Sequence, residues 1–425
     1  MRNRRLLFFC AEEYPPIYPF LDVVFNTHLR EQGIVTSWIM PSRSCDTLEE
    51  TTWNGARTYL IPKPQGGSAA TLVPRYWRHL GHIRAAADRA LGAGVGVDLL
   101  QVRDDPAMAY VAWRLARRIG VPWAYQVSHL KEEERILYAQ MGIYGSRLAN
   151  ALQGRVGRLL RNALLRRADL VFPISDQMTK TLLSANLSPE RTVAIPEGIR
   201  SADFDAVGAD EKQVVRRRLG LEGKLVMVYA GTMNRFRRLD FLLRVLARLV
   251  ERLPTAHLLM VGAGREPGDV EWLQSLARQM GLGSHVTFVG WVPRDEAAAY
   301  IAAADVGVSP FPPDPVLKNN SPIKLLEYLA AGVPVVGTDI PEQSSVIQES
   351  GGGFCVPWEE GRFARSVEEL FRLSPEERKR MGVRGKEYVT TRRDFRVLAD
   401  RVDTAYSRLA PDPQDPGSIS DLRDS

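Results

Sequence analysis

The sequence predicts an α/β protein built from two doubly wound, Rossmann-like domains, and three observations predict it. Short aliphatic and β-branched runs alternate with amphipathic stretches in the first half of the chain, and the same alternation returns in the second half. The runs lack a strict apolar and polar alternation, which is typical of parallel strands buried on both faces. The 425 residues are too many for one core and suit two domains.

In the first half, the apolar runs predict seven strands. The stretches at residues 20–32 and 106–119 have apolar residues three and four positions apart, which predicts helices between the strands. The predicted strands are Leu6–Cys10, Ile34–Met40, Thr58–Ile61, Asp98–Val102, Trp123–Val127, Leu170–Ile174 and Val193–Ile195.

In the second half, five further runs predict strands, each followed by a helical segment. These are Lys224–Ala230, His257–Val261, His285–Val289, Asp305–Ser309 and Val333–Gly337. Residues 241–250 predict the helix after the first of them, and residues 374–409 predict helices with breaks at Gly382 and Gly385.

The domain boundary is predicted where the strand signal stops, in a Pro/Gly turn at residues 196–204 that precedes a charged helix at 210–219. We therefore expect an N-terminal domain at residues 1–200 and a C-terminal domain at 201–391, with a cleft between two domains joined by a short hinge. Residues 392–410 are expected to form a helix that packs back on the N-terminal domain. Residues 411–425 are Pro-rich and polar, which predicts disorder.

Composition excludes several classes of protein. The three cysteines, Cys10, Cys45 and Cys355, are far apart and have no C-x-x-C spacing, so neither a disulfide framework nor a zinc site is expected. The N-terminal apolar run is cut short by Glu12 and Glu13, unlike a signal peptide, and no run approaches the ~18 apolar residues of a membrane span. A cytoplasmic location is the expectation.

Charge is divided unevenly along the chain. The net charge is +6, but residues 1–200 hold 26 basic and 18 acidic residues (+8), whereas residues 201–425 hold 30 and 32 (−2). The basic excess therefore belongs to the first half.

Ligands of open α/β sheets bind beyond the carboxyl ends of the strands. No G-x-G-x-x-G follows the first strand, and the Gly262-Ala-Gly264 turn lacks the third glycine, so a nicotinamide or flavin dinucleotide site is not expected.

The densest signal begins at Ser321. Ser321 and Pro322 predict a helix start, with Ser321 as N-cap, and Gly332 predicts its end. A helix N-terminus attracts anions, so Lys324 in the first turn is unfavourable there unless an anion joins it. Glu327 lies on the same helix and suits paired ribose hydroxyls. This segment predicts a phosphate site, and the alternative is a plain surface helix.

A second basic cluster, Arg235, Arg237 and Arg238, follows the predicted strand Lys224–Ala230. Arginine suits bidentate contact with phosphate oxygens, so a loop of this kind at a strand end can neutralise a diphosphate. The alternative is that the three side chains are simply solvated.

Together these motifs resemble the glycosyltransferases of the GT-B fold, specifically the retaining, nucleotide-sugar-dependent family 4. The resemblance runs from about Leu225 to Tyr406 and is specific, because five motifs occur in the family's order and spacing. They are the glycine and basic loop after the first strand, Val261-Gly-Ala-Gly, Val286-Thr-Phe-Val-Gly-Trp-Val, Ala304-Asp-Val-Gly-Val-Ser-Pro-Phe, and the segment from Ser321 to Val336.

The resemblance assigns donor-site roles to residues of the second half. Arg238 falls where the family has a lysine that contacts the diphosphate, and Arg235 or Arg237 substitutes for the family arginine replaced by Thr232. Glu327 matches the second glutamate of the E-x7-E motif, which binds the ribose. The remaining donor residues are Gly290, Trp291 and Val292 at the nucleobase and Asn320, Ser321, Pro322 and Ile323 at the phosphates.

The chain departs from the family at several positions. Asn319 stands where the first motif glutamate is expected, and an amide can bind sugar hydroxyls but cannot stabilise positive charge as a carboxylate does. Glu12–Pro16 replace the glycine-rich loop after the first strand. His129 lies one residue from the position of a family histidine, and it is either an active-site hydrogen-bonding group or an ordinary loop histidine. Arg103 after its strand is a weaker candidate.

The resemblance implies transfer of a sugar from a nucleoside diphosphate sugar to an acceptor hydroxyl with retention of configuration, in synthesis of a surface polysaccharide or glycolipid. The leaving diphosphate is the main charge to stabilise, and Arg238, Lys324 and the N–H groups at 321–323 would supply positive potential. A divalent metal is then dispensable, and neither metal nor cofactor is expected. Two alternatives are a catalytically silent nucleotide-sugar-binding protein and an epimerase of the same fold.

Residues 146–167 contain six arginines and no acid, interleaved with leucines and valines at helical spacing, and Tyr76 and Trp77 add aromatic residues elsewhere in the first half. This predicts a basic amphipathic helix. One interpretation is that its apolar face packs on the sheet while the arginines are solvated. The other is peripheral binding to an anionic membrane that holds a glycan or lipid-linked acceptor. A nucleic-acid partner is not expected, because the sequence shows no known binding module.

Overall fold

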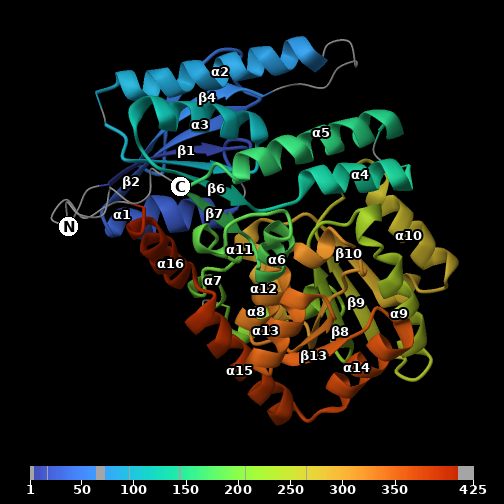
Figure 1. Cartoon of the computed structure of the whole chain (residues 1–425). Helices are drawn as coiled ribbons and strands as arrows, with labels where there is room; N and C mark the ends of the chain where they lie inside the picture. Colours follow the sequence, from blue (N-terminus) through green and yellow to red (C-terminus); the bar gives the residue numbers. More distant parts are fainter. Residues whose placement is uncertain are drawn as a thin grey trace. The chain divides into compact units, whose positions relative to one another are not determined.

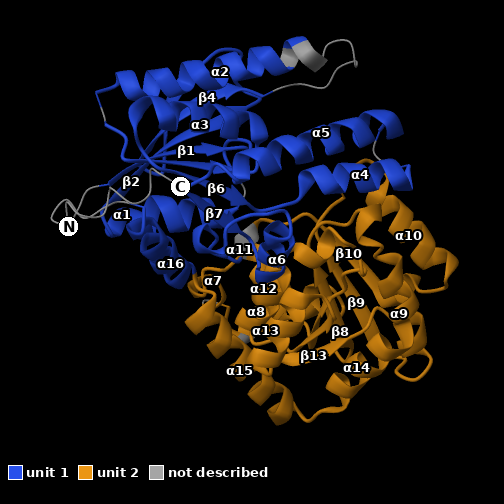
Figure 2. Ribbon diagram, in the orientation of Figure 1, with its two compact units in different colours: residues 1–196, 395–425 blue, residues 197–394 orange. Residues whose placement is uncertain are grey.

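The computed structural model describes residues 4–16, 18–63, 72–94, 96–142, 145–205, 207–264 and 266–409. The chain divides into two compact units (Figure 2). Unit 1 is residues 1–196 with 395–425, and unit 2 is residues 197–394. The tail predicted at 411–425 lies outside the described residues.

Unit 1 is built on a seven-stranded sheet in the order β3-β4-β2-β1-β5-β6-β7. All its neighbours run parallel except β3, which pairs antiparallel with β4. The strands are β1 Arg4–Cys10, β2 Ile34–Ser42, β3 Glu49–Trp53, β4 Ala56–Pro62, β5 Leu99–Arg103, β6 Trp123–Val127 and β7 Leu170–Pro173. Six of the predicted strands match β1, β2, β4, β5, β6 and β7 to within two residues at each end.

Helices connect these strands, and α3 has the clearest local cause. Asp105 caps it by accepting hydrogen bonds from the backbone N–H groups of Ala107 and Met108, Pro106 takes the first position, and Gly120 ends it in the left-handed conformation. The helices of unit 1 are η1 Leu21–His28, α1 Leu29–Glu31, α2 Leu72–Gly92, α3 Pro106–Ile119, α4 Lys131–Met141, α5 Arg147–Leu165, α6 Asp176–Leu183, η3 Pro189–Arg191 and α16 Phe395–Ser407.

The last helix, α16, belongs to the core of unit 1. Phe395, Leu398 and Val402 are buried in the same cluster as residues of β1, β2 and η1. Gln32 donates a hydrogen bond to Asp400 across 2.6 Å, and the Tyr406 hydroxyl donates to Gln101 of β5. Residues from both the first strands and the last helix therefore form the core of unit 1.

Unit 2 is built on a six-stranded parallel sheet in the order β10-β9-β8-β11-β12-β13, with an apolar core on each face. Strand order reverses between β8 and β11, where a doubly wound sheet binds its ligands. The strands are β8 Leu225–Ala230, β9 Ala256–Val261, β10 Val286–Gly290, β11 Val306–Ser309, β12 Val335–Thr338 and β13 Gly353–Val356. The helices are α7 Ala202–Asp205, α8 Ala209–Arg218, η4 Arg235–Arg237, α9 Asp240–Val250, α10 Asp269–Gln279, η5 Gly283–His285, α11 Arg294–Ala302, η6 Leu317–Asn319, α12 Ile323–Ala330, α13 Pro341–Ser350, α14 Glu360–Arg372 and α15 Pro375–Arg392 (Figure 1).

Two strands were not predicted, and one predicted strand is absent. β3 is a polar edge strand followed by Asn54 and Gly55, both at positive φ, and this Asn-Gly pair is the hairpin signal that could have found it. Residues 193–195 hold no strand. Val193 and Ile195 donate backbone hydrogen bonds to Val171 and Pro173 of β7, but Pro196 has no N–H with which to continue the ladder.

The predicted breaks at Gly382 and Gly385 are wrong, because α15 runs through both residues without interruption. Each glycine lets α15 approach its neighbours closely. A Cβ atom on Gly382 would lie 2.0 Å from the Gly332 carbonyl oxygen, and one on Gly385 would lie 2.7 Å from the Leu329 side chain. The close approach of α15 to its neighbours therefore explains why glycine occupies both positions.

We predict that Gly382→Ala lowers the free energy of unfolding by about 1–3 kcal/mol, because the new methyl group overlaps backbone that cannot move aside. Chemical denaturation of the full chain measures this change. Gly81 is the matched control, because it lies inside α2 and a Cβ atom added there would have no neighbour within 4 Å, so Gly81→Ala should stabilise the protein by about 0.5–1 kcal/mol. Equal effects of the two substitutions would contradict the close-packing explanation.

Candidate functional site

The loops after β8 and β9 form a rigid base at the carboxyl edge of the unit 2 sheet. The backbone N–H of Gly231 donates to Val261 across 2.9 Å, and that of Met233 donates to Ala263 across 2.8 Å. Gly262 has φ +131°, and a Cβ atom there would lie 2.2 Å from the Gly231 carbonyl oxygen. These glycines let the two loops run side by side, which fixes the start of the basic segment.

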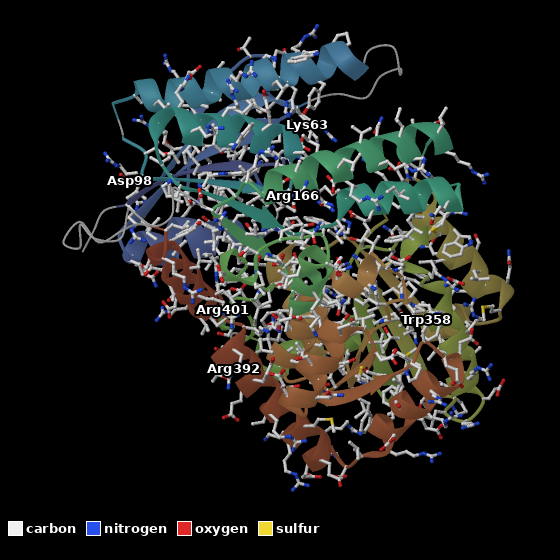
Figure 3. The ribbon with its side chains drawn as sticks, in the orientation of Figure 1. Lys63, Asp98, Arg166, Trp358, Arg392 and Arg401 are labelled. Carbon is white, nitrogen blue, oxygen red and sulfur yellow. The ribbon has the colours of Figure 1, made fainter. Side chains whose placement is uncertain are left out.

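The basic segment is a single 3-10 turn, η4. Asn234 caps it by accepting a hydrogen bond from the backbone N–H of Arg237 across 3.0 Å, and Arg238 follows in the left-handed conformation with φ +52°. The three guanidinium groups lie over three different aromatic rings. The guanidinium of Arg235 lies 5.3 Å from the centre of the Trp272 ring. That of Arg237 lies 5.0 Å from the centre of the Phe311 ring. That of Arg238 lies 5.6 Å from the centre of the ring of Trp358, a residue labelled in Figure 3. The three arginines therefore diverge.

Lys324 meets one of these arginines at the same ring. Its ammonium lies 4.7 Å from the centre of the Phe311 ring and 5.1 Å from that of Tyr229. Burial among these groups, reinforced by the charge of Arg237, lowers the pKa of Lys324 well below its ordinary value, and Glu327 opposes the shift only in part. Two cations therefore face one ring. From the sequence, Lys324 and Arg238 were expected to act together on the diphosphate. In the structure, Arg237 is the arginine that shares the Phe311 ring with Lys324.

The prediction that Ser321 is the N-cap of this helix is wrong. Helix α12 begins at Ile323 after Pro322, and no side chain caps it. The buried Ser321 hydroxyl instead accepts a hydrogen bond from the backbone N–H of Glu197 across 3.1 Å and donates to Glu342 across 3.3 Å. Glu342 in turn accepts from Arg393 across 2.7 Å. The first turn of α12 is thus anchored from behind, and its N–H groups have no side-chain cap.

The remaining residues of the motif take different positions around α12. Asn319 is 1% exposed, and its amide nitrogen donates a hydrogen bond to the Pro315 carbonyl across 2.7 Å. This hydrogen bond lies within the loop that carries Asn319. Asn320 is half-buried and follows η6. Glu327 is half-buried one turn after Lys324 on the same helix.

The predicted nucleobase loop follows β10. The Gly290 carbonyl accepts a hydrogen bond from the backbone N–H of Gly262 across 2.8 Å, so this loop continues the base formed by the loops after β8 and β9. Trp291 is 74% exposed, and Val292 packs partly against the core. The Thr232 carbonyl accepts from the Tyr229 hydroxyl across 2.8 Å, which ties Thr232 to the residue that also contacts Lys324.

A pocket of about 280 Å³ opens next to the rings under Arg237 and Arg238. Its walls come from the ends of β11, β12 and β13. The lining residues are Phe311, Pro313, Asp314, Pro315, Lys318, Asp339, Ile340, Pro341 and Trp358. Aromatic faces with two carboxylates and one lysine suit a polar ligand with apolar faces, such as a sugar ring.

In unit 1, charged residues gather at the ends of β5 and β6. Asp104 is buried at φ +66° and accepts hydrogen bonds from the backbone N–H of Ser128 across 2.7 Å and from the Ser128 hydroxyl. Burial alone would raise the pKa of Asp104, but Lys131, Arg103 and Ser128 together hold it below its ordinary value. His129 lies 3.3 Å from Glu134 through Nε2 and is partly exposed. Asp104 therefore fixes the loop that carries His129.

The sequence alone did not identify Phe311, Tyr229 or Asp104. Phe311 and Tyr229 look like ordinary apolar residues at strand ends, and only the fold shows that they lie under two cations. Asp104 could have been predicted from the sequence, because Asp104 and Asp105 directly follow a buried strand and acidic residues are rarely buried. In the described part of the chain, no group of three or more His, Cys, Asp and Glu side chains is placed to hold a metal ion.

Comparison with known proteins identifies the family. The model for the glycosyl transferase 4-like domain matches residues 27–198, and the model for glycosyl transferases group 1 matches residues 224–372. The chain is 26% identical over 208 residues to the putative glycosyltransferase EpsD of Bacillus subtilis, which covers 48% of this chain and 52% of that protein. It is 30% identical over 172 residues to a GDP-mannose-dependent mannosyltransferase of Mycolicibacterium smegmatis that acts on phosphatidylinositol monomannoside, covering 40% and 44%. The matched region spans about half the length of these curated relatives.

The fold comparison covers nearly the whole chain. The crystal structure of Anabaena HepE in complex with UDP superposes with a TM-score of 0.69 at 15% identity, covering 95% of this chain and all of that one. WaaG, a glycosyltransferase involved in lipopolysaccharide biosynthesis, superposes with a TM-score of 0.67 at 17% identity, covering 96% and 100%. From both family matches and this shared fold, the chain belongs to the GT-B glycosyltransferases and resembles glycosyltransferase family 4.

Proposed function

We propose that the protein transfers a sugar from a nucleoside diphosphate sugar to an acceptor hydroxyl, with retention of anomeric configuration, in the synthesis of a polysaccharide or glycolipid. One observation carries this proposal. Arg237 and Lys324 both face the ring of Phe311, beside the uncapped N-terminus of α12. Like charges held this close are unfavourable until an anion joins them, and a diphosphate is an anion of the right charge.

The donor fits the order of the loops along the sheet. The diphosphate would lie between η4 and the start of α12, with Glu327 at the ribose and the Gly290–Val292 loop at the nucleobase. The exposed ring of Trp291 offers a flat surface beside that base. A nucleotide-sugar donor is also supported by HepE, whose structures are described in complex with UDP and with UDP-glucose.

The reaction requires stabilisation of the leaving diphosphate more than any other group. Cleavage of the anomeric bond leaves an oxocarbenium-like sugar and sends the electron pair to the diphosphate oxygen. Arg237, Lys324 and the backbone N–H groups of Ser321 and Ile323 would take up that charge, and Arg238 would contribute at longer range. The proposal assigns this role to protein cations and needs neither metal nor cofactor.

Unit 1 would hold the acceptor. His129, positioned by Asp104 and paired with Glu134, is the candidate for a hydrogen bond to the reacting hydroxyl or sugar. A glycan or lipid-linked acceptor is supported by the names of two relatives, the mannosyltransferase above and a putative teichuronic acid biosynthesis glycosyltransferase of Bacillus subtilis.

A second candidate function is a nucleotide-sugar-binding protein without transfer activity. Asn319 favours it, because the side chain is neutral and its amide nitrogen is engaged by Pro315. Under this alternative the donor binds and no reaction follows.

We predict that Arg237→Ala weakens binding of UDP by about 10- to 100-fold, the value of a lost charge-assisted hydrogen bond. Isothermal titration calorimetry measures the dissociation constant. Arg235→Ala is the matched control, because Arg235 lies over Trp272 on α10, away from Lys324, and should change binding less than threefold (~0.6 kcal/mol). A larger loss for Arg235→Ala than for Arg237→Ala would contradict this assignment.

We predict that UDP binding takes up a proton through Lys324. The pKa of Lys324 is lowered in the free protein, and the diphosphate would raise it, so between the two values binding adds a proton and affinity falls as the pH rises. Calorimetry in buffers of different ionisation enthalpy measures the uptake.

The lysine responsible is identified by two variants. Lys324→Met should abolish the uptake. Lys212 on α8 has its pKa lowered by burial too, but it lies away from the proposed donor loops, so Lys212→Met should leave the uptake unchanged. Undiminished uptake in Lys324→Met would exclude Lys324 as the group that titrates.

The proposed reaction is tested by screening nucleotide sugars for thermal stabilisation and then incubating the donor with glycan and lipid-linked acceptors. We expect release of nucleoside diphosphate and a product whose anomeric coupling constant in NMR matches the donor configuration. Binding without release for every acceptor would favour the silent binding protein. An inverted anomer would exclude the retaining mechanism while keeping the transfer, and conversion of the donor sugar without acceptor would indicate an epimerase.

A further inference from the structure

Helix α5 has an apolar face that unit 1 does not cover. Leu148, Leu152, Val156 and Leu159 are 80%, 60%, 56% and 71% exposed. They are spaced four, four and three residues apart, so they share one side of the helix. The residues that α5 buries, among them Gly154, Arg161 and Leu165, lie on the opposite side. The interpretation that the whole apolar face packs on the sheet is therefore wrong for this stripe.

The packing of α5 against α4 fixes which side faces outward. A Cβ atom on Gly154 would lie 2.6 Å from the backbone carbonyl oxygen of Glu132, so the two helices touch at this glycine. Arg161 is buried and pairs with Glu132 across 2.7 Å and with Glu133 across 2.6 Å. Although burial opposes its charge, Glu133 and Glu132 hold the pKa of Arg161 above its ordinary value. Turning the stripe inward would expose these groups and break both ion pairs.

The charged residues of α5 itself are all positive. Arg147, Arg155 and Arg158 are exposed on α5, and Arg166 and Arg167 are exposed just after it (Figure 3 labels Arg166). No acidic residue occurs between positions 147 and 167. Figure 1 shows α5 as a long helix alongside α4, and its 19 residues correspond to about 28 Å. The surface is thus a straight apolar line bordered by arginines.

We propose that α5 docks unit 1 on an anionic lipid bilayer, with the four apolar side chains inserted at the boundary between headgroups and acyl chains and the arginines bound to lipid phosphates. Continuous apolar side chains with cationic neighbours are the features that bind a helix flat on such a surface. A second copy of α5 would match the apolar stripe but would bring like charges together. The proposal concerns binding alone and does not depend on the proposed transferase activity.

One further observation agrees with an interfacial role for this unit. Tyr76 and Trp77, near the start of α2, are also large exposed side chains of unit 1, and tyrosine and tryptophan favour the headgroup region. Among the described residues, no helix combines the length and apolarity needed to cross a bilayer. Attachment by α5 would be peripheral and sensitive to salt.

The test is co-sedimentation of the full chain with vesicles of phosphatidylcholine containing 30% (about one third) phosphatidylglycerol, compared with pure phosphatidylcholine, a contrast chosen for the anionic surface. We expect binding to the anionic vesicles at low salt, little binding to the neutral ones, and release as salt rises. Replacing Leu148, Leu152, Val156 and Leu159 together by Gln should lower the partition coefficient more than tenfold (~1.4 kcal/mol). Arg155→Gln with Arg158→Gln should lower it about fivefold per arginine.

The control removes exposed apolar side chains elsewhere. Val214 on α8 and Val383 on α15 are exposed in unit 2, so Val214→Gln with Val383→Gln should bind vesicles like the unaltered protein. Circular dichroism and thermal unfolding check that the α5 variant folds, which its exposed positions predict. The proposal is overturned if the unaltered protein does not bind anionic vesicles at low salt, or if the folded α5 variant binds undiminished. It is also overturned if the stripe instead holds two copies together, seen as a dimer in light scattering that the α5 variant dissolves.

Discussion

The candidate site in unit 2 depends on the electrostatic repulsion between Arg237 and Lys324, which both lie over the ring of Phe311. The ring's negative face relieves part of the repulsion, because cations are attracted to aromatic faces. The rest remains, and together with burial, which is the larger cause, it lowers the pKa of Lys324. Like charges held close together without an anion do not stabilise the fold. The surrounding loops serve mainly to hold these two side chains in place.

Arg237 and Lys324 are held in place by backbone contacts between loops and by buried polar side chains next to the start of α12. Gly231 and Gly262 allow the loops after β8 and β9 to lie in contact, and Asn234 fixes the turn that carries Arg237. On the other side, Ser321 is tied to Glu342, and Arg393 neutralises that buried carboxylate. Since a buried charge without a partner is costly, removing Arg393 would disturb the start of α12 as well. The turn that carries Arg237 and the start of α12 are thus held in place by the protein's own hydrogen bonds.

The sequence predicted the elements that local chemistry determines. Pro106–Ile119 matches α3 at both ends because cap, proline and terminal glycine all act within the segment. Errors arose where distant residues decide. Ser321 has the chemistry of an N-cap but meets Glu342 and Glu197, and Gly382 resembles a helix break but meets Gly332. For the predicted donor site, the motif indicated the loops, but only the fold shows that Arg237 is the arginine that meets Lys324. The roles proposed for His129, Asn319 and Glu327 stay predictions.

The position of α16 has a consequence for how the protein folds during synthesis. Unit 2 is an insertion within unit 1, because the chain leaves unit 1 at residue 196 and returns to it at residue 395. The buried residues Phe395, Leu398 and Tyr406 are therefore the last of the core of unit 1 to leave the ribosome. Every residue of unit 2 is available earlier, so unit 2 can be complete while unit 1 still lacks one side of its core. Premature termination before α16 would leave a complete unit 2 joined to an open, aggregation-prone sheet.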